Sequence, residues 1–371
     1  MQILRKTNLE ALKLVDRLER EEFLEKMEEK NLVGRGGAGF PTAKKWRMAL
    51  EQDKKPLLVI NADEGEPGTF KDKFILENNC ETFIEGVMLA SKVLGAEKAF
   101  IYLRGEYEYL RESVEETIDE LDKKTSKDFD ITVVRGAGAY VCGEETSILQ
   151  SIMGERGNSM KKPPYPTEEG LWGRPTVVNN VETVTCIPQL LVYDDWNPDL
   201  RLFSLSGNVS NAGLFEVPLG VKVSTLIDLS RPKNSLKAMS LGNFGGIMPI
   251  EQDMEINPEL IDGENCFHGT YSLVWIDETN NIADVCKNIA EFYTYESCGK
   301  CTPCREGSKE ILDLLTKICN ERGSEEDLEQ LRYMAKHVNQ TSLCGLGKTV
   351  GKHVLTGFEH FEEDFREKVE L

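Results

Sequence analysis

The chain has 371 residues, of which 64 are acidic and 44 are basic, so its formal net charge is −20. A negative surplus of this size opposes sequence-independent binding to nucleic acid or to anionic lipid. The length is sufficient for two or three domains with full hydrophobic cores. We find no secretory leader and no apolar run long enough to span a bilayer, so the ten cysteines are expected to stay reduced in the cytoplasm.

The first 32 residues predict amphipathic N-terminal helices, because Leu and Val recur among charged residues at near-helical spacing. A glycine-rich run follows at residues 34–39 and leads through Pro41 into a predicted helix that carries Lys44 and Lys45. A loop of this kind before a helix N-terminus is suited to bind an anion. The run does not follow a clear strand, so the ordinary Gly-x-Gly-x-x-Gly dinucleotide fingerprint lacks its structural context.

Residues 33–200 alternate between predicted strands and helices, which is typical of a doubly wound α/β domain. The first strand, at 56–60, ends in a segment that holds Asp63, Glu64 and Glu66. The carboxyl end of a strand is where ligands bind in open α/β sheets. A solvated acidic turn would have a similar composition. The further elements predicted here are helices over 81–94 and 106–124 and strands over 98–103 and 131–134.

Three later segments of this region carry polar side chains beside glycine or proline. A second glycine loop, GAGAYVCGEETS at 136–147, opens a helix with two glutamates in its first turn. The segment KKPPYP at 161–166 offers two cations and an aromatic ring. A probable strand then ends in Asn179 and Asn180, whose amides suit either the edge of a heterocycle or a turn.

The predicted secondary structure changes twice in the rest of the chain. Residues 201–280 read as short strands and turns, with a short helix at 224–229 and a strand at 271–276, which indicates a small α+β module. From residue 281 the pattern is helical, and we expect helices over 288–295, 309–322 and 325–339.

The cysteine spacing is the strongest chemical signal. Cys298, Cys301 and Cys304 are each separated by two residues, and Cys344 lies in a second glycine-flanked turn. Four thiolates are what a 4Fe-4S cluster requires. Structural zinc usually takes two ligands from each of two turns rather than three from one. The other cysteines lack ligand spacing and are expected to be small buried apolar groups: Cys80, Cys142, Cys186, Cys266, Cys286 and Cys319.

Taken together, six motifs resemble the flavin-bearing, NADH-oxidising subunit of respiratory complex I and its relatives in NAD-linked hydrogenases and formate dehydrogenases. The motifs are GRGGAGFPT, NADEGEPGTFKD, GAGAYVCGEET, KKPPYP, VVNNVET and ESCGKCTPCREG. The resemblance covers nearly the whole chain after about residue 30. It implies a Rossmann-like FMN domain at 33–200, a ubiquitin-like (SLBB-type) α+β module at 201–280, and a helical bundle at 281–371 that carries one 4Fe-4S cluster.

The resemblance also assigns site residues by matching motif. Met48 stands where many relatives have a second aromatic, so adenine stacking is expected to be weaker or rearranged there. The cluster ligands are Cys298, Cys301, Cys304 and Cys344. The NAD contacts are Phe40, Glu66, Lys162 and Tyr165, with Glu66 and Glu145 as positioning groups. The FMN contacts are Gly34, Arg35, Gly36, Gly37, Lys45, Asn61, Asp63, Glu64, Tyr140, Gly143, Glu144, Glu145, Val178, Asn179 and Asn180.

The implied activity is that of an NADH dehydrogenase (diaphorase) subunit. Hydride passes between NAD(H) and FMN, and single electrons then pass to the 4Fe-4S cluster, so no side chain is needed as a nucleophile. Glutamates near the nicotinamide cofactor favour NAD over NADP, because an added ribose phosphate would be repelled.

The resemblance finally implies partners, since the chain has no further cysteine run to hold another cluster. These are a thioredoxin-like 2Fe-2S subunit and a larger iron-sulfur, hydrogenase or formate dehydrogenase subunit. We expect a cytoplasmic location, either free or peripheral to a membrane complex. Two alternatives stay open: an electron-bifurcating NAD/ferredoxin module, and a cofactor-free structural subunit, which the intact cysteine set and both glycine loops oppose.

Overall fold

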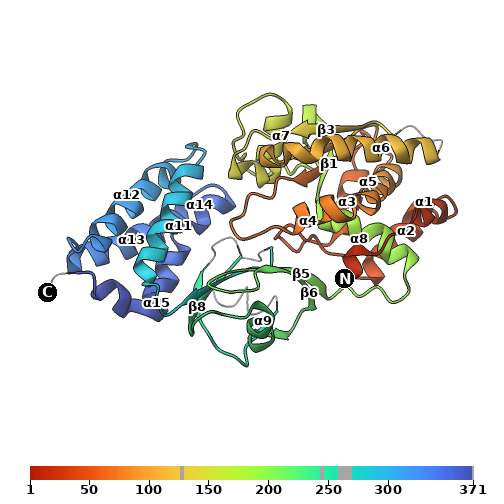
Figure 1. Ribbon diagram of the computed structural model, residues 1–371. Coiled ribbons are helices and arrows are strands. Elements are labelled where there is room, and N and C mark those ends of the chain that lie inside the picture. The colour runs from red at the N-terminus through yellow and green to blue at the C-terminus, as the bar shows by residue number, and fades with distance from the viewer. Residues whose placement is uncertain (126–128, 243–245, 258–269, 370–371) are drawn as a thin grey trace. The chain divides into compact units, whose positions relative to one another are not determined.

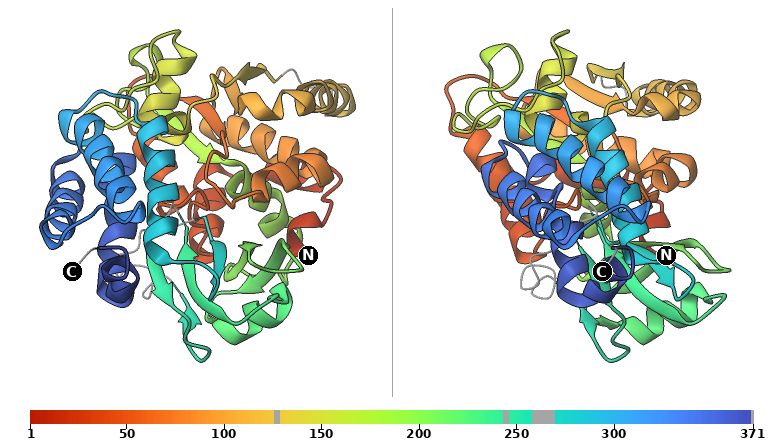
Figure 2. Two further views of the ribbon diagram at one scale, coloured as in Figure 1. Left: turned by 60° about the vertical axis from the view of Figure 1, so that its left-hand side comes forward. Right: turned by 90° about the vertical axis from the view of Figure 1, so that its left-hand side faces the viewer.

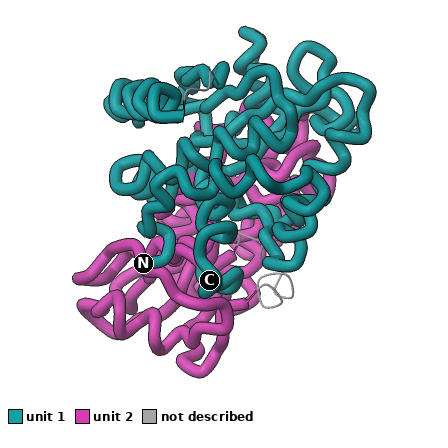
Figure 3. The backbone as a smooth tube through the Cα atoms, turned by 90° about the vertical axis from the view of Figure 1, so that its right-hand side faces the viewer, with its two compact units in different colours: residues 1–65, 70–200 teal, residues 66–69, 201–371 magenta. Residues whose placement is uncertain are grey.

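The computed structural model describes residues 1–125, 129–242, 246–257 and 270–369. It divides into two compact units, shown in different colours in Figure 3. Unit 1 comprises residues 1–65 and 70–200, and unit 2 comprises residues 66–69 and 201–371. The chain is a mixed α/β protein with a parallel sheet in unit 1 and a group of C-terminal helices in unit 2. Both features agree with the α/β class and the C-terminal helices predicted from the sequence.

Unit 1 is built on a four-stranded parallel sheet of order β3-β2-β1-β4. The two central strands, β1 and β2, are short runs of mainly buried apolar residues, as expected where both faces of a parallel sheet are covered, and β3 at the edge is only partly buried. The three strands predicted with bounds agree within two residues. The strands are β1 (Leu57–Ala62), β2 (Ala99–Leu103), β3 (Ile131–Arg135) and β4 (Thr176–Asn180).

The strand order has a functional consequence. The chain proceeds from β1 outward to β2 and β3, and then crosses back to place β4 on the other side of β1. In open α/β sheets, a crevice forms outside the carboxyl ends of the strands at the point where the order reverses. The carboxyl ends of β1 and β4 are therefore the place to look for a ligand.

The helices of unit 1 cover this sheet (Figure 1). Helix α5 contacts both α6 and α8, and it ends at Gly95, whose positive φ of 61° suits glycine. The predicted helix over 106–124 is a 3₁₀ turn (Gly105–Leu110) followed by α6. Helix α8, which follows β4 directly, was not predicted. The bounds are α4 (Lys71–Asn78), α5 (Cys80–Leu94), α6 (Arg111–Thr125), α7 (Glu145–Ile152) and α8 (Val181–Val192).

The N-terminal helices also belong to unit 1. Helix α1 contacts α5 and α8, and α2 contacts α3, which in turn contacts β4. The segment before α1 is tied down by Gln189, whose amide donates hydrogen bonds to the carbonyls of Gln2, Ile3 and Arg5. These helices are α1 (Glu10–Val15), α2 (Arg20–Glu29) and α3 (Thr42–Leu50).

Unit 2 contains a five-stranded sheet of order β6-β5-β11-β8-β9. Short strands were predicted in this region from the sequence. Its core contains Phe203, Leu226 and Trp275, and the Trp275 indole donates a 2.8 Å hydrogen bond to the Ser230 hydroxyl. The elements of this part are β5 (Leu200–Gly207), β6 (Gly213–Pro218), β7 (Val221–Lys222), α9 (Val223–Ser230), β8 (Leu236–Leu241), β9 (Ile247–Pro249), β10 (Glu255–Ile256) and β11 (Ser272–Asp277).

The remainder of unit 2 is helical. Helices α11, α12, α13 and α15 pack on one another, and both views of Figure 2 show these blue helices side by side. Helix α12 begins seven residues earlier than predicted, because Pro303 is favourable in the first turn of a helix. Among the described residues, no helix combines the length and the apolar composition needed to cross a membrane. The bounds are α11 (Ile282–Glu296), α12 (Thr302–Cys319), α13 (Glu325–Thr341), α14 (Gly345–Thr349) and α15 (Lys352–Arg366).

Candidate functional site

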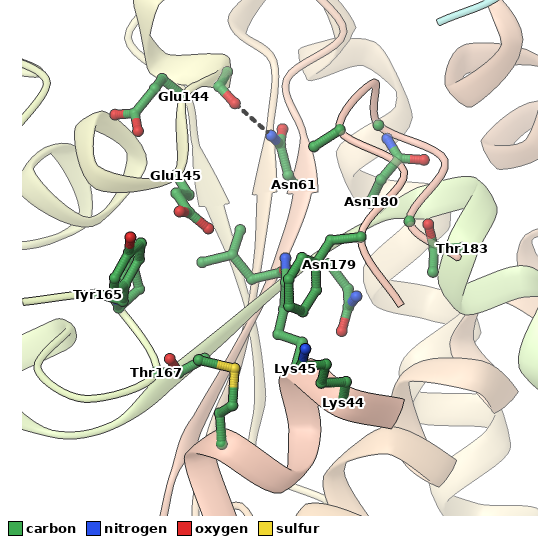
Figure 4. A pocket seen from close by; sticks show the side chains of 18 of the residues that line it. Lys44, Lys45, Asn61, Glu144, Glu145, Tyr165, Thr167, Asn179, Asn180 and Thr183 are labelled. Carbon is green, nitrogen blue, oxygen red and sulfur yellow. Dashed lines mark hydrogen bonds between the residues drawn. The ribbon is translucent and has the colours of Figure 1, made fainter. Parts of the chain in front are cut away.

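A cavity of about 610 Å³ opens in unit 1 where β1 and β4 end. Its wall includes Asn61 at the end of β1 and residues 178–180 at the end of β4. Figure 4 shows Glu144, Glu145 and Tyr165 on one side of the cavity. The volume is within the ordinary range for small-molecule and cofactor sites.

The first glycine loop forms another part of the wall. The Gly34 amide donates a 2.8 Å hydrogen bond to the carbonyl of Phe40, which closes the loop just before α3. A Cβ on Gly36 would lie 3.1 Å from the Cβ of Asn180, so the absence of a side chain lets the loop lie against the end of β4. The N-terminus of α3, the positive end of the helix dipole, follows immediately.

A lysine contributes positive charge to the cavity. The Lys45 ammonium donates a 3.1 Å hydrogen bond to the carbonyl of Val178. Burial lowers the pKa of Lys45; the charge of Glu145 acts in the opposite direction, and that of Lys162 lowers it further. A lysine whose charge is costly to bury in the protein alone is suited to receive an anionic group. Lys44 lies one residue earlier, with its ammonium 5.9 Å from the centre of the Phe40 ring.

The two asparagines at the end of β4 form hydrogen bonds with residues of α3 and α4. The Trp46 indole donates a 2.9 Å hydrogen bond to Asn179 Oδ1. The Asn180 amide donates a 2.6 Å hydrogen bond to Asp72, and its oxygen accepts one of 3.1 Å from Lys71. Both asparagines therefore bind other parts of unit 1 while they also line the cavity.

A cluster of buried charges lies behind this wall. Arg35 pairs with Glu182 at 2.9 Å, and Lys71 pairs with Glu182 at 3.3 Å and with Asp72 at 2.6 Å. Each of these four side chains is buried. Burial raises the pKa of Asp72, an effect that Lys71 opposes. For Lys71 burial acts to lower the pKa, but the carboxylates of Asp72 and Glu182 raise it overall, so the lysine is charged at neutral pH.

The acidic segment after β1 has a mainly structural role. The Glu64 carboxylate accepts hydrogen bonds from the amides of Asp72 and Lys73, which satisfies the start of α4. Burial and, secondly, the charge of Asp72 raise the pKa of Glu64 to about 7. The Asn61 amide donates a 2.8 Å hydrogen bond to the carbonyl of Gly143, drawn as a dashed line in Figure 4.

A charged group lies along the edge of the cavity. The Glu144 carboxylate accepts hydrogen bonds from the amides of Thr146 and Ser147 and so caps the N-terminus of α7. The Lys162 ammonium bridges Glu144 at 3.1 Å and Glu145 at 2.5 Å. Burial acts to lower the pKa of Lys162, and the two carboxylates, led by Glu145, raise it overall.

Most of the predicted cofactor residues line this one cavity. Arg35, Gly37, Asp63, Glu64 and Tyr140 do not line it, and Glu66 belongs to unit 2. The predicted residues that do line it are Gly34, Gly36, Phe40, Lys45, Asn61, Gly143, Glu144, Glu145, Lys162, Tyr165, Val178, Asn179 and Asn180.

Sequence reasoning missed several lining residues. Lys44 is one of them, and it lies four residues before Met48 on α3, so helical spacing could have identified that face. Met48 itself, which the family resemblance placed near the adenine, also lines the cavity. Thr183 lies in the first turn of α8, a helix that was not predicted. The other missed residues, Ala38, Pro166 and Thr167, carry no comparable signal.

The four expected cluster ligands lie together in the helical part of unit 2. Cys301 precedes α12 and Cys344 precedes α14, so each stands at a helix start with free backbone amides. Cys304 is buried in the first turn of α12, with its sulfur 3.3 Å from the Ser297 hydroxyl. Burial raises the pKa of the Cys304 thiol to about 11, and Cys301, Cys344 and Cys298 are near enough to raise it further.

The turns around these thiols suit a bulky cluster. Gly299 has φ of 75°, and its carbonyl accepts a 2.8 Å hydrogen bond from Arg305. Within the described residues, no three His, Cys, Asp or Glu side chains meet closely enough to hold a single metal ion. In a 4Fe-4S cluster each thiolate binds a different iron, so the thiols need not meet at one point. Three thiols from one turn and a fourth from another match the ligand set of a 4Fe-4S cluster, whereas structural zinc usually takes two ligands from each of two turns.

The remaining cysteines differ in burial. Cys142, Cys186 and Cys286 are buried, as predicted. The prediction is wrong for Cys80 and Cys319, which are half-buried because they stand at the first residue of α5 and the last residue of α12. Cys266 lies outside the described residues.

Comparison with known proteins agrees with this arrangement of sites. Residues 27–189 match the Nuo51 FMN-binding domain, and residues 284–368 match the NADH-ubiquinone oxidoreductase-F iron-sulfur binding region. The chain is 36% identical to the F subunit of the NADH-quinone oxidoreductase of Aquifex aeolicus (strain VF5), across 96% of this chain and 88% of that protein. The chain belongs to the family of NADH-quinone oxidoreductase F subunits.

The likeness within this family extends to hydrogenase subunits. The chain is 34% identical to the NADP-reducing hydrogenase subunit HndC of Solidesulfovibrio fructosivorans, across 94% of this chain and 76% of that protein. A crystal structure of NAD⁺-reducing [NiFe]-hydrogenase in the air-oxidized state superposes with a TM-score of 0.89 at 34% identity. That comparison covers 95% of this chain and 63% of the hydrogenase chain.

Membership of the family of NADH-quinone oxidoreductase F subunits confirms the predicted family, cofactors and type of activity. The chain has an FMN-binding domain and a 4Fe-4S binding region. It is an oxidoreductase subunit of the NADH dehydrogenase type, in which electrons pass between NAD(H) and an iron-sulfur cluster by way of FMN.

Proposed function

We propose that the unit 1 cavity holds FMN, with the flavin phosphate against the first glycine loop, Lys45 and the N-terminal turn of α8. The observation that carries this proposal is the coincidence of three features in one cavity. It lies where the strand order reverses, Gly34 and Gly36 line it, and the Lys45 ammonium is within 3.1 Å of the Val178 carbonyl that lines it.

The other FMN residues of the prediction divide into two roles. Asn61, Gly143 and Glu144 line the cavity and would contact the flavin directly. Arg35, Gly37, Asp63, Glu64 and Tyr140 would act from behind the wall or through the backbone. In this assignment residues 33–200 form a Rossmann-like domain, with the helices of residues 1–32 packed onto it.

We assign the nicotinamide cofactor to the edge of the same cavity. Phe40 and Tyr165 are aromatic residues that keep more than a third of their surface exposed, at 37% and 46%. Such rings suit stacking on a cofactor. The bridge from Lys162 to Glu145 supplies the polar anchor. Met48 is proposed as the side chain that fills the adenine side.

The same edge favours NAD over NADP. Glu144 and Glu145 place two carboxylates at this edge, where both pair with Lys162. An added ribose phosphate would be repelled there. Because a relative is named as an NADP-reducing hydrogenase subunit, this preference requires its own measurement. Comparable turnover with NADPH and NADH would remove it.

The chain's own residues bind and orient, and none of them acts as a nucleophile. When bound, FMN supplies the chemistry that accepts a hydride from nicotinamide and returns electrons singly. Lys45 holds a positive charge beside the cavity, and the Lys162–Glu145 pair fixes the edge where the nicotinamide cofactor enters. Cys298, Cys301, Cys304 and Cys344 hold the 4Fe-4S cluster, which the amides at the starts of α12 and α14 stabilise.

The cluster and its supporting fold belong to the second unit. We propose that residues 201–280 are a ubiquitin-like (SLBB-type) module and that residues 281–371 are the cluster-binding bundle. Electrons would leave through a thioredoxin-like 2Fe-2S subunit and a larger iron-sulfur, hydrogenase or formate dehydrogenase subunit, because relatives include subunits of both quinone-linked and hydrogenase enzymes. A cytoplasmic location, free or peripheral to a membrane complex, is proposed with them.

The test is anaerobic purification of the full chain, followed by flavin extraction, iron and sulfide analysis, and NADH-dependent ferricyanide reduction. We expect about one FMN and about four iron atoms per chain. Lys45→Met should lose flavin but keep iron, and Lys13→Met, at an exposed position of α1, is its control. A chain that binds neither FMN nor iron would instead be the cofactor-free structural subunit.

A further inference from the structure

Two buried charged residues of α4 contact the wall of the FMN cavity without lining it. Lys71 and Asp72 form the first turn of α4, with 1% and 3% of their surfaces exposed, and the Lys71 ammonium lies 2.6 Å from the Asp72 carboxylate. Burying a charged pair is costly unless each group has further partners. The identity of those partners shows what the pair does.

The main partner of both side chains is Asn180, a lining residue of the cavity. Its amide donates to Asp72 Oδ2 at 2.6 Å, and its oxygen accepts from the Lys71 ammonium at 3.1 Å. The same oxygen accepts from the Glu182 amide at 3.0 Å, so Asn180 is also the N-cap of α8. Three bonds therefore fix one amide, and two of them come from α4.

The buried charged residues also contact the glycine loop through Glu182 and Arg35. The Lys71 ammonium also contacts Glu182 at 3.3 Å, and Glu182 accepts a 2.9 Å hydrogen bond from Arg35. The Arg35 amide donates a 2.8 Å hydrogen bond to Thr183. The glycine loop on either side of Arg35 thus rests on the first turn of α8, and Gly36 lies against Asn180.

We propose that Lys71 and Asp72 are positioning residues for FMN, which act by holding Asn180 and the N-terminus of α8 against the glycine loop. This inference rests on the proposed assignment of the cavity to FMN. Neither residue lines the cavity, so their effect on FMN would pass through Asn180 and α8. They set the geometry of the two elements between which the flavin phosphate would bind.

The competing explanation is that the cluster, with two cations and two carboxylates, only stabilises the fold. Both explanations predict that removing one charge lowers the free energy of unfolding, because an unpaired charge remains buried. The two explanations differ in their predictions for FMN affinity. Only the positioning role predicts that changes at Lys71 or Asp72 weaken FMN binding, and that this effect depends on Asn180.

The first measurement is FMN affinity in flavin-depleted full-length protein, from the quenching of FMN fluorescence on titration. Asp72→Asn keeps the shape of the side chain and removes its charge, and Lys71→Met removes the ammonium. We expect the FMN Kd to rise about ten- to hundredfold in each, since hydrogen bonds to charged groups are lost. Matched controls on the same helix are Glu77→Gln and Lys73→Met, whose side chains lie on the surface.

The second measurement is a double-mutant cycle with Asn180→Ser, which keeps an N-cap hydroxyl but cannot span both partners. In that background Asp72→Asn should change the FMN Kd by less than about twofold, while still lowering the unfolding midpoint. Asn180→Ser by itself tests the same link if a buried-charge variant fails to fold. An effect of Asp72→Asn that persists in full in the Asn180→Ser background would overturn the inference.

The outcomes separate the inference from the assignment on which it rests. If the unaltered chain binds FMN and both α4 variants bind it equally well, the inference is overturned and the cavity assignment stands. If the unaltered chain binds no FMN, the assignment and the inference are overturned together.

Discussion

His353 stacks on Tyr293 inside the helical part of unit 2, with ring centroids 6.0 Å apart and an angle of 15° between the rings. His353 is fully buried, and neither of its ring nitrogens has a hydrogen-bond partner among the described residues. Burial lowers the pKa of His353 to about 3, so the imidazole is neutral in the folded protein. The unfolded chain, with a pKa near 6.5, takes up a proton first as the pH falls.

This environment predicts a stability cost at acid pH. Because the folded-state pKa is depressed, the stability is fully present above about pH 6.5 and is lost as the pH falls toward 3. We expect His353→Leu to be more stable than the unaltered chain by about 1–2 kcal/mol at pH 5. Urea unfolding at pH 5 and pH 7 measures this. His337→Leu, an exposed histidine on α13, is the control, and an equal gain at both pH values would contradict the prediction.

Lys45 predicts a trade-off between stability and binding. Burial lowers the pKa of its ammonium, so holding the charge costs free energy in the flavin-free protein. We expect Lys45→Met to raise the free energy of unfolding of that form by about 1 kcal/mol. The same change should weaken FMN binding about tenfold or more, because a contact to phosphate is lost.

The measurements for Lys45→Met are urea unfolding of flavin-depleted protein and FMN titration. Lys13→Met is the matched control, since Lys13 is an exposed lysine of α1 that does not line the cavity. A variant that is less stable and binds FMN normally would show that the lysine serves the fold and not the cofactor.

Glu64 predicts a pH dependence of the opposite sign to that of His353. Its folded-state pKa is raised to about 7 by burial first and by the charge of Asp72 second, while Lys71 opposes the shift. A raised carboxyl pKa means that the stability is fully present below the unfolded value of 4.5 and is lost as the pH rises through about 7. The protonated carboxyl is favoured in the folded state, and ionising it in a buried position costs free energy.

The test of this dependence is unfolding of the flavin-free chain between pH 5 and pH 8. We expect Glu64→Gln to make the decline in stability shallower by up to about 1 kcal/mol per pH unit. Glu77→Gln, at an exposed position of α4, should leave the slope unchanged. If Glu64→Gln leaves the change of unfolding free energy with pH unaltered, the Glu64 carboxylate does not cause that change.

Cys344 should separate the two halves of the reaction. We expect Cys344→Ala to lose the 4Fe-4S cluster, to keep part of the NADH-dependent ferricyanide reduction, and to stop electron transfer to the native partner. Iron analysis and the two activity assays check this. Cys319→Ala, a cysteine outside the cluster turns, should keep all three properties. Full native transfer in the Cys344 variant would remove Cys344 from the ligand set.

The amino-acid sequence by itself determined the features that depend on neighbours along the chain. The segments 56–60 and 98–103 predict strands, and the alternation of such strands with helices predicts a doubly wound α/β domain. The spacing of Cys298, Cys301 and Cys304 predicts a cluster turn, because thiolates two residues apart can share a cluster. The motifs as a set also identified the family and its cofactors.

Tertiary structure decided which of the predicted residues line the cavity. Arg35 and Glu182 are 147 positions apart and Asn180 and Asp72 are 108 apart, yet each pair meets in the interior. Patterns of neighbouring residues in the sequence do not predict contacts between residues so far apart. A charged residue in a motif can face the ligand or hold the wall behind it. The choice depends on which buried partner satisfies the charge, and only the packing of α4, α8 and the glycine loop on one another supplies that partner.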